Sequence, residues 1–207
     1  MHGSPLLIVI SGPSGAGKSR LSQALLERFP QLRFSVSATT RPPRAGELNG
    51  VHYFFVSEQE FLARVAADDF LEWAKVYGNY YGTLKSHVDE LMAAGYDVLL
   101  DIDTQGALQI KSKCPQGVFV FVVPPSPQEL ARRIASRGTE TPESMAQRLA
   151  GAANELAHAG AYDYIVVNDE VEAAVGRLAS IIVAERCRAS RQDLSWFQSF
   201  GQEGERR

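Results

Sequence analysis

The sequence has few cysteines, no long apolar run and no excess of basic residues. Its two cysteines, Cys114 and Cys187, form no C-x-x-C pair, so we expect reduced thiols rather than a disulfide framework or a thiolate metal site. The longest apolar runs, at 5–10 and 118–125, are far shorter than the ~20 residues of a membrane span. The first residues lack the basic and apolar regions of a secretory signal. These absences predict a soluble, cytoplasmic protein that is not embedded in a membrane.

The charge balance excludes a further class of partner. With 21 Lys and Arg against 24 Asp and Glu, the net charge is −3, and such a chain has no global basic surface with which to displace the counterions of a nucleic acid. Gly and Pro, at 17 and 10 of 207 residues, are too ordinary for a collagen-like or disordered chain. The length predicts one domain, or a core with a small insertion.

What the sequence does contain is a series of short, fully apolar segments alternating with helical patterns. Apolar, strand-length segments lie at 6–10, 98–100, 118–123 and 165–167. Continuous apolar strands that alternate with helices are typical of a parallel sheet covered on both faces, an α/β fold. A last helix is predicted by a stripe of apolar residues at helical spacing: Val171, Ala174, Val175, Leu178, Ile181 and Ile182.

Two segments interrupt this alternation. Residues 34–57 mix polar, glycine and aromatic residues in short alternating pieces, which predicts a small antiparallel lobe inserted after the first strand and helix and continuing to about residue 83. Residues 124–151 are rich in Pro, Ser and Arg. They predict one helix that ends at Gly138 and another that opens at Thr141 and Pro142.

The sharpest motif is a glycine-rich loop between a predicted strand and a predicted helix. It reads Gly12, Pro13, Ser14, Gly15, Ala16, Gly17, Lys18 and Ser19, and fits G-x-x-x-x-G-K-[ST]. Glycines let successive backbone N–H groups surround phosphate oxygens, while Lys18 reaches the outer phosphates and Ser19 offers a hydroxyl to Mg²⁺. The loop therefore predicts binding of a nucleoside triphosphate.

The apolar strand predicted at 96–103 ends in two carboxylates, at the edge where the ligands of parallel sheets bind. Asp101 is suited to a hydrated Mg²⁺ that bridges phosphates. Asp103 also begins a D-x-x-G pattern, which occurs in GTPases, but the N-K-x-D motif that reads their base is absent. A GTPase remains the less favoured interpretation.

Arginines suggest a phosphorylated acceptor. Arg41 and Arg44 lie three residues apart on a predicted turn, a spacing suited to gripping a phosphate, although a solvated loop is the simpler alternative. Arg133 and Arg137 share one helix face and Arg148 follows on the next helix. Surface charge would explain any one of these, but the two helices offer few acidic partners. We therefore expect a focused cationic site for phosphoryl transfer.

Over about 6–186 the sequence resembles the guanylate kinase family, which transfers the γ-phosphoryl group of ATP to GMP. The resemblance is carried by the glycine-rich loop and by segments at 35–47, 50–57, 70–74, 78–83, 100–106, 137–139 and 167–169. It implies a domain at 4–186, with core segments 4–33 and 84–186, a GMP-binding lobe at about 34–83 and a lid at about 126–151. Residues 187–207 form a tail whose aromatics, Trp196, Phe197 and Phe200, have no counterpart in the family pattern.

The resemblance also implies roles for individual residues. The GMP phosphate would be held by Arg41, Arg44, Tyr53 and Tyr81. The guanine would be read by Ser37, Glu72 and Thr83 beside Gly82, with Asp101 and Asp103 close by. The phosphates would be covered by the lid residues Arg133, Arg137 and Arg148, with Arg132 as a rival for the role of Arg133. The adenine of ATP would lie beside Asn168 and Asp169.

Chemistry supports the guanine assignment. One carboxylate can accept both the N1–H and N2–H₂ donors of guanine, whereas adenine presents an acceptor at N1. Without the neighbouring motifs, Glu72 would be interpreted as a surface acid at a helix end. We expect ATP and Mg²⁺ as cofactors, GMP and dGMP as acceptors, no nucleic-acid partner, and either a monomer or a homo-oligomer. Two rival hypotheses stay open: a non-catalytic interaction module of the same fold, and a kinase for another phosphorylated small molecule.

Overall fold

The computed structural model describes residues 4–135, 142–193 and 195, and its centre is a parallel sheet. Every paired strand of this sheet runs parallel to its neighbour. In spatial order the strands are β2 (Leu32–Phe34), β7 (Asp97–Asp101), β1 (Leu7–Ser11), β8 (Val118–Val123) and β9 (Tyr164–Val167). The parallel α/β core predicted from the apolar segments is confirmed.

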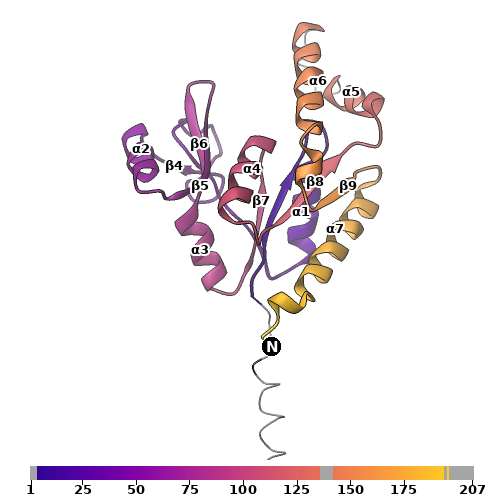
Figure 1. The fold of residues 1–207 in the computed structure, drawn as a ribbon. Helices are drawn as coiled ribbons and strands as arrows, with labels where there is room; N and C mark the ends of the chain where they lie inside the picture. Colours follow the sequence, from indigo (N-terminus) through magenta and orange to yellow (C-terminus); the bar gives the residue numbers. More distant parts are fainter. Residues whose placement is uncertain (1–3, 136–141, 194, 196–207) are drawn as a thin grey trace, which may run out of the picture.

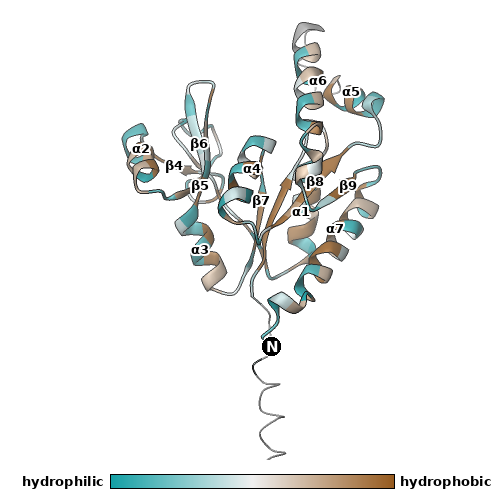
Figure 2. Cartoon of the chain, in the orientation of Figure 1, coloured by the Kyte–Doolittle hydropathy of each residue, from teal (hydrophilic) through white to brown (hydrophobic). Residues whose placement is uncertain are grey.

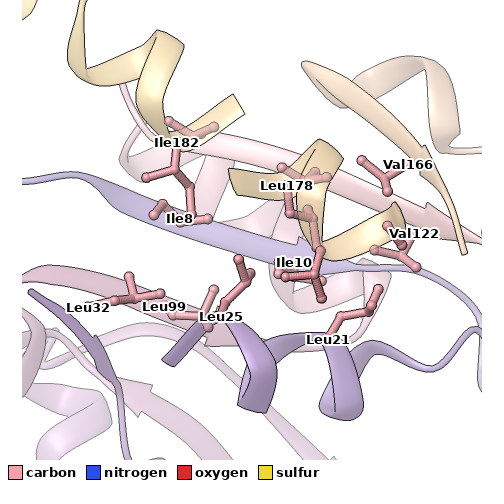
Figure 3. Close-up of a cluster of buried hydrophobic side chains, with 14 of the residues drawn as sticks. Ile8, Ile10, Leu21, Leu25, Leu32, Leu99, Val122, Val166, Leu178 and Ile182 are labelled. Atoms are coloured by element: carbon pink, nitrogen blue, oxygen red, sulfur yellow. The ribbon is translucent and has the colours of Figure 1, made fainter. Parts of the chain in front are cut away.

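The two faces of the core sheet are covered by different helices (Figure 1). Ile8 and Ile10 of β1 pack among residues of α1 (Lys18–Arg28) and α7 (Val171–Arg186), as Figure 3 shows. The intervening Leu7 and Val9 face the other way, toward α3 (Lys85–Ala93) and α4 (Thr104–Lys113). This alternation explains why the strands are apolar on both sides and appear brown in Figure 2. The predicted last helix is confirmed as α7.

The inserted lobe has a sheet of its own. Its spatial order is β4 (Phe54–Phe55), β3 (Ala38–Thr39), β6 (Asn79–Leu84) and β5 (Phe70–Val76), flanked by α2 (Glu58–Ala66). The prediction of an antiparallel lobe is wrong for one pair, since β3 and β4 run parallel. The long connection after Thr39 turns the chain back before Phe54, so both strands point the same way. Phe34, expected in the lobe, instead ends core strand β2.

The lobe sits directly against the core. Phe70 belongs to the lobe's cluster of buried residues, while its neighbour Leu71 belongs to the core cluster beneath α3 and α4. The backbone N–H of Trp73 also donates to the Gln109 side chain of α4 at 3.3 Å. Strand β5 therefore joins the lobe to the edge of the core that holds the ends of β1 and β7.

Two helices lie across the core from the lobe (Figure 1). They are α5 (Pro127–Ala135) and α6 (Pro142–Leu156), which share a small cluster of Leu130, Ile134 and Ala152. The predicted ends Gly138 and Thr141, like Arg137 and the tail aromatics, lie outside the described residues. Short 3₁₀ helices follow at η1 (Ala159–Ala161) and η2 (Ala189–Arg191). Within the described residues no helix is both long and apolar enough to cross a membrane.

Candidate active site

The glycine-rich loop connects β1 to α1 and depends on its glycines. Gly12, Gly15 and Gly17 have positive φ values of 137°, 93° and 89°, a region that other residues enter only with strain. A Cβ atom at Gly12 would also lie 2.1 Å from the carbonyl oxygen of Val122. The loop can therefore curl tightly above β1 and aim its N–H groups at a bound anion.

Lys18 and Ser19 begin α1 at the edge of a cavity of about 480 Å³. The Lys18 Nζ donates to the carbonyl oxygen of Gly12 at 2.7 Å, which folds the side chain back over the loop. The Ser19 hydroxyl donates to Asp101 Oδ2 at 2.9 Å. Asp101, at the end of β7, also lines the cavity with Asp103. The predicted phosphate and metal residues are thus brought together.

The carboxylates of this cavity have distinct environments. Burial raises the pKa of Asp101, and the positive charge of Lys18 and the hydrogen bond from Ser19 oppose that rise. Asp103 is exposed and caps α4 by accepting from the N–H of Gly106 at 2.8 Å. In the described residues no group of three or more His, Cys, Asp or Glu side chains could hold a metal. One carboxylate and one hydroxyl fit a Mg²⁺ that keeps its waters and binds phosphate oxygens.

A second cavity, of about 380 Å³, lies on the other side of Gly17. Asn168 and Asp169, the residues predicted to lie beside adenine, line it together with Arg132 and Arg133. Asn168 is 4% exposed, and its Nδ2 donates to the carbonyl oxygen of Ala16 at 2.7 Å. Asn168 therefore braces the glycine-rich loop as well as lining the cavity.

Asp169 binds Arg177 of α7, with Nη1 of the arginine 2.7 Å from Oδ1. The expectation that the helices at 124–151 offer their arginines few acidic partners is wrong for Arg133. Glu129 accepts from Arg132 Nε at 2.7 Å and from Arg133 Nε at 2.6 Å. The error arose because one carboxylate, at i−3 and i−4 on the same helix turn, serves both guanidinium groups. Arg133 also donates through Nη2 to the carbonyl oxygen of Asn168 at 3.0 Å.

Helix α6 contacts the cavity beside Lys18 and Ser19, called the phosphate cavity from here on, through one of its faces. Arg148 Nη2 donates to the Ser14 hydroxyl at 2.8 Å, which brings this predicted lid residue onto the glycine-rich loop. Seven residues later, Glu155 accepts from the buried Thr104 hydroxyl at 3.2 Å and also lines the cavity. Burial raises the pKa of Glu155, while the charge of Lys18 opposes the rise. The sequence reasoning missed Glu155, although its seven-residue spacing from Arg148 places both on one helix face.

Two of the predicted guanine-reading residues, Glu72 and Thr83, meet at the junction of lobe and core. Glu72 on β5 pairs with Thr83 on β6, and the Thr83 hydroxyl donates to Glu72 Oε1 at 2.6 Å. Glu72 is 8% exposed, so the alternative interpretation as a surface acid at a helix end is wrong. Burial raises the pKa of Glu72, with a further rise from the charge of Asp103 and an opposing effect of Thr83. Ser37 lies just before β3, on the neighbouring segment of the lobe sheet.

Gly82 has a structural reason to be glycine, because a Cβ atom there would lie 2.7 Å from the Phe70 ring and 2.8 Å from the carbonyl oxygen of Glu72. Gly106, the second glycine of this region, approaches the side chain of Glu72. A Cβ atom at Gly106 would lie 3.0 Å from Glu72 Oε2. Gly82 therefore leaves room for the Phe70 ring and the backbone of β5, and Gly106 leaves room for the buried carboxylate.

The predicted acceptor-phosphate residues lie farther out on the lobe. The guanidinium of Arg41 sits 5.5 Å from the ring centroid of Tyr53, and the Tyr53 and Tyr81 rings are 6.2 Å apart. A hydrogen bond with Tyr81 also raises the pKa of Arg41, after the larger effect of Glu47. Arg44 is exposed. Three of the four predicted residues are thus neighbours, and Arg44 lies at the surface of the same loop.

These features define a class of protein. A parallel sheet with a glycine-rich loop after β1, a lysine and serine at the start of α1 and a carboxylate at the end of β7 make a P-loop nucleotide-binding fold. A buried carboxylate, Glu72, lies where the inserted lobe meets the core, and a cluster of Arg and Tyr lies farther out on that lobe. This combination is that of a P-loop kinase for a small phosphorylated acceptor.

Comparisons with known proteins identify the family. A family model described as guanylate kinase matches residues 4–185. Guanylate kinase of Desulfitobacterium hafniense is 56% identical over 191 residues, 92% of this chain and 94% of its own length. That of Symbiobacterium thermophilum is 50% identical over 199 residues, 96% of this chain and 94% of its own. A crystal structure of guanylate kinase from Anaplasma phagocytophilum aligns with a TM-score of 0.72 at 35% identity, covering 92% of this chain and 90% of that one.

The chain belongs to the guanylate kinase family and is an enzyme, a nucleoside monophosphate kinase. The resemblance stated from the sequence motifs is confirmed, as is the P-loop core.

Proposed function

We propose that this enzyme transfers the γ-phosphoryl group of MgATP to GMP, and also to dGMP, to give ADP and GDP or dGDP. The observation that carries the proposal is the pairing of two sites at one edge of the core sheet. The phosphate cavity around Lys18 lies beside a buried Glu72 and Thr83 pair, separated from it by the segment that begins at Asp101. One site suits a triphosphate and the other suits a guanine edge.

On the donor side, the cavity of Lys18, Ser19 and Asp101 would take the phosphates, and the cavity beyond Gly17 would take adenine and ribose. Ser19 and Asp101 would hold Mg²⁺, largely through its waters. When bound, the metal offsets charge on the phosphate oxygens. Arg133 and Arg148 already contact the loop and its bracing residue. A small rotation of these guanidinium groups onto phosphate oxygens would stabilise charge during transfer.

On the acceptor side, Glu72 would accept from N1–H and N2–H₂ of guanine while Thr83 holds its other oxygen. Such paired hydrogen bonds reject a base that lacks the donors by ~10⁴–10⁵. None of the proposed contacts involves the ribose 2′-hydroxyl, which is why dGMP is included. Arg41, Arg44, Tyr53 and Tyr81 would hold the phosphate.

The reaction needs no general base on the enzyme. The attacking oxygen belongs to a phosphate that is already ionised near neutral pH, so catalysis consists of alignment, charge stabilisation and exclusion of water. Accordingly, the cavity contains Lys18, serine hydroxyls and carboxylates, and no histidine or cysteine is among the described residues that line it.

The direct test follows the label from ATP carrying a radioactive γ-phosphate. In the presence of GMP and Mg²⁺, the label should appear in GDP with one ADP formed per GDP. Release of the label as inorganic phosphate, independent of GMP, would indicate a nucleotide hydrolase and contradict the proposal. A chain that binds GMP without any turnover would instead support the non-catalytic interaction module.

A further inference from the structure

Glu47, in the loop between β3 and β4, makes contacts that the proposed phosphate site does not account for. Its carboxylate accepts from both terminal nitrogens of Arg41, at 3.0 Å from Nη1 to Oε2 and 2.8 Å from Nη2 to Oε1. Oε2 also accepts from the backbone N–H of Arg44 at 2.7 Å. Only 14% of the Arg41 side chain and 18% of that of Glu47 are exposed. One carboxylate thus joins the two arginines proposed to hold the GMP phosphate.

The bonds to Glu47 and Pro42 occupy only part of the Arg41 guanidinium. Arg41 Nη1 also donates to the carbonyl oxygen of Pro42 at 2.7 Å, so both of its protons are used. The bonds to Glu47 and Pro42 run through Nη1 and Nη2 alone. Neither Glu47 nor Pro42 contacts the adjacent edge of the planar guanidinium, which is formed by Nε–H and the second Nη2–H. Such an edge can bind two phosphate oxygens side by side. Arg41 also forms a hydrogen bond with Tyr81, another residue proposed to hold the phosphate.

Two aromatic rings further restrict the position of the Arg41 guanidinium. The Arg41 guanidinium is 5.5 Å from the centroid of Tyr53 and 5.8 Å from that of Phe55. Tyr53 and Phe55 are themselves 5.9 Å apart, in a tilted arrangement. An arginine side chain has many rotamers in solution, and holding it against two rings and one carboxylate removes most of them before a ligand arrives.

We propose that Glu47 is a positioning residue, which holds Arg41 and the backbone of Arg44 in the geometry that grips the acceptor phosphate. The inference rests on the proposed function, because it takes Arg41 to be a phosphate ligand. It makes a counterintuitive prediction: an acidic residue beside a phosphate site strengthens binding of the anion, because preorganisation of Arg41 outweighs the repulsion between Glu47 and the phosphate.

The test is Glu47→Gln, which keeps the shape of the side chain and removes its charge. The KM for GMP should rise about tenfold or more, while the KM for ATP and the kcat at saturating GMP stay within about twofold. Glu58→Gln, the same change on exposed α2 of the same lobe, is the matched control and should leave all three unchanged. A fall in the KM for GMP would mean that repulsion dominates and would overturn the inference.

Two further measurements separate positioning from loss of lobe structure. Guanosine, which lacks the phosphate, should inhibit the wild type and Glu47→Gln with the same Ki. If the substitution raises the Ki for guanosine as much as it raises the KM for GMP, Glu47 has a merely structural role. In an Arg41→Met background, Glu47→Gln should have no further effect on the KM for GMP. A full additional effect there would refute action through Arg41. If the wild type does not phosphorylate GMP at all, the proposed function fails instead.

Discussion

At the scale of single residues, Lys18 is the side chain on which phosphoryl transfer should depend most. It projects from the first turn of α1 and folds over Gly12, in the cavity that would hold the triphosphate. Lys18→Ala should lower kcat by at least ~10²–10³, the effect of removing one group that stabilises transition-state charge. Lys85→Ala, at the start of α3, is the control. Unchanged turnover with an unchanged circular dichroism spectrum would contradict the assignment.

Glu72 should show a conflict between stability and function. Because burial raises its pKa, the folded state holds this proton more tightly than the unfolded state does. Protonated Glu72 therefore makes its full contribution to the free energy of unfolding at pH values below the pKa of Glu72 in the unfolded chain. That contribution is lost as the pH rises through the higher pKa of Glu72 in the folded protein. Glu72→Gln, which cannot ionise, should raise the Tm relative to wild type at pH 8, by roughly 2–4 °C per kcal/mol for a chain of this size. The difference should shrink toward pH 4.

The same variant should lose activity, because the amide presents a donor to the guanine N2–H₂ group. An unsatisfied pair costs ~1–3 kcal/mol, so kcat/KM for GMP should fall about 5- to 150-fold while the KM for ATP is unchanged. Thermal melts from pH 4 to 8 and steady-state kinetics measure the two effects. A Tm difference that grows as the pH falls would contradict the assigned sign.

Sequence could identify residues that belong to a motif but not those that act through tertiary contacts. Lys18 and Ser19 were predictable because their chemistry follows from local spacing after a strand. The placement of Asp101 at the end of β7 was predictable for the same reason. Glu155 was not, because its contact with Thr104 joins residues 51 apart in the chain. The pairing of Glu129 with two arginines, in contrast, follows from i,i+3 and i,i+4 spacing on one helix and could have been predicted.

At the scale of elements, the approach of α4 to β5 should control the acceptor site. A Cβ atom at Gly106 would lie 3.0 Å from Glu72 Oε2 and 3.3 Å from its Cδ. Gly106→Ala should therefore displace the carboxylate and raise the KM for GMP several-fold, with the KM for ATP unchanged. An unaltered KM for GMP would mean that Glu72 does not read the base.

The matched control for Gly106→Ala is Gly176→Ala on α7, where a Cβ atom would meet nothing within 4 Å. Alanine in a helix interior is favoured over glycine by roughly 0.5–1 kcal/mol. Gly176→Ala should thus raise the free energy of unfolding, measured in urea, without changing either KM. A rise in the KM for GMP in both variants would point to a general effect of the substitution.

Long elements followed from the sequence more readily than short ones. β8 and α7 carry a continuous apolar run and an apolar stripe, so that their patterns predict them directly. β3 and β4 have two residues each, too few for a periodic pattern. Their parallel pairing is set by the path of the intervening loop, which no local signal specifies. The edge strand β2 was missed for the same reason.

At the scale of the whole molecule, the proposed donor and acceptor sites lie in the core and in the inserted lobe, which meet at one edge. Each ligand alone should therefore stabilise the enzyme, by about 2.7 kcal/mol at a concentration of 100 Kd. Lys18→Ala should lose most of the Tm increase caused by MgATP and keep that caused by GMP. Glu72→Gln should show the reverse. Loss of both increases in either variant would contradict independent sites.

The division into a core and an inserted lobe was predictable in outline, because the composition changes after β2. The contact between the two parts was not. Phe70 and Leu71 are adjacent in sequence and both are buried, yet they belong to different hydrophobic clusters. Only the three-dimensional arrangement reveals that β5 carries Glu72 from the lobe sheet to the edge of the core.

The central claim, phosphoryl transfer from ATP to a guanine nucleotide, is tested most directly by initial rates across GMP, dGMP, AMP, CMP and UMP as acceptors. A coupled assay for ADP formation at fixed MgATP gives kcat/KM for each. GMP and dGMP should be used efficiently and AMP less well by ~10⁴ or more, because Glu72 would face the N1 acceptor of adenine. Equal kcat/KM values for AMP and GMP would contradict the assignment of the acceptor.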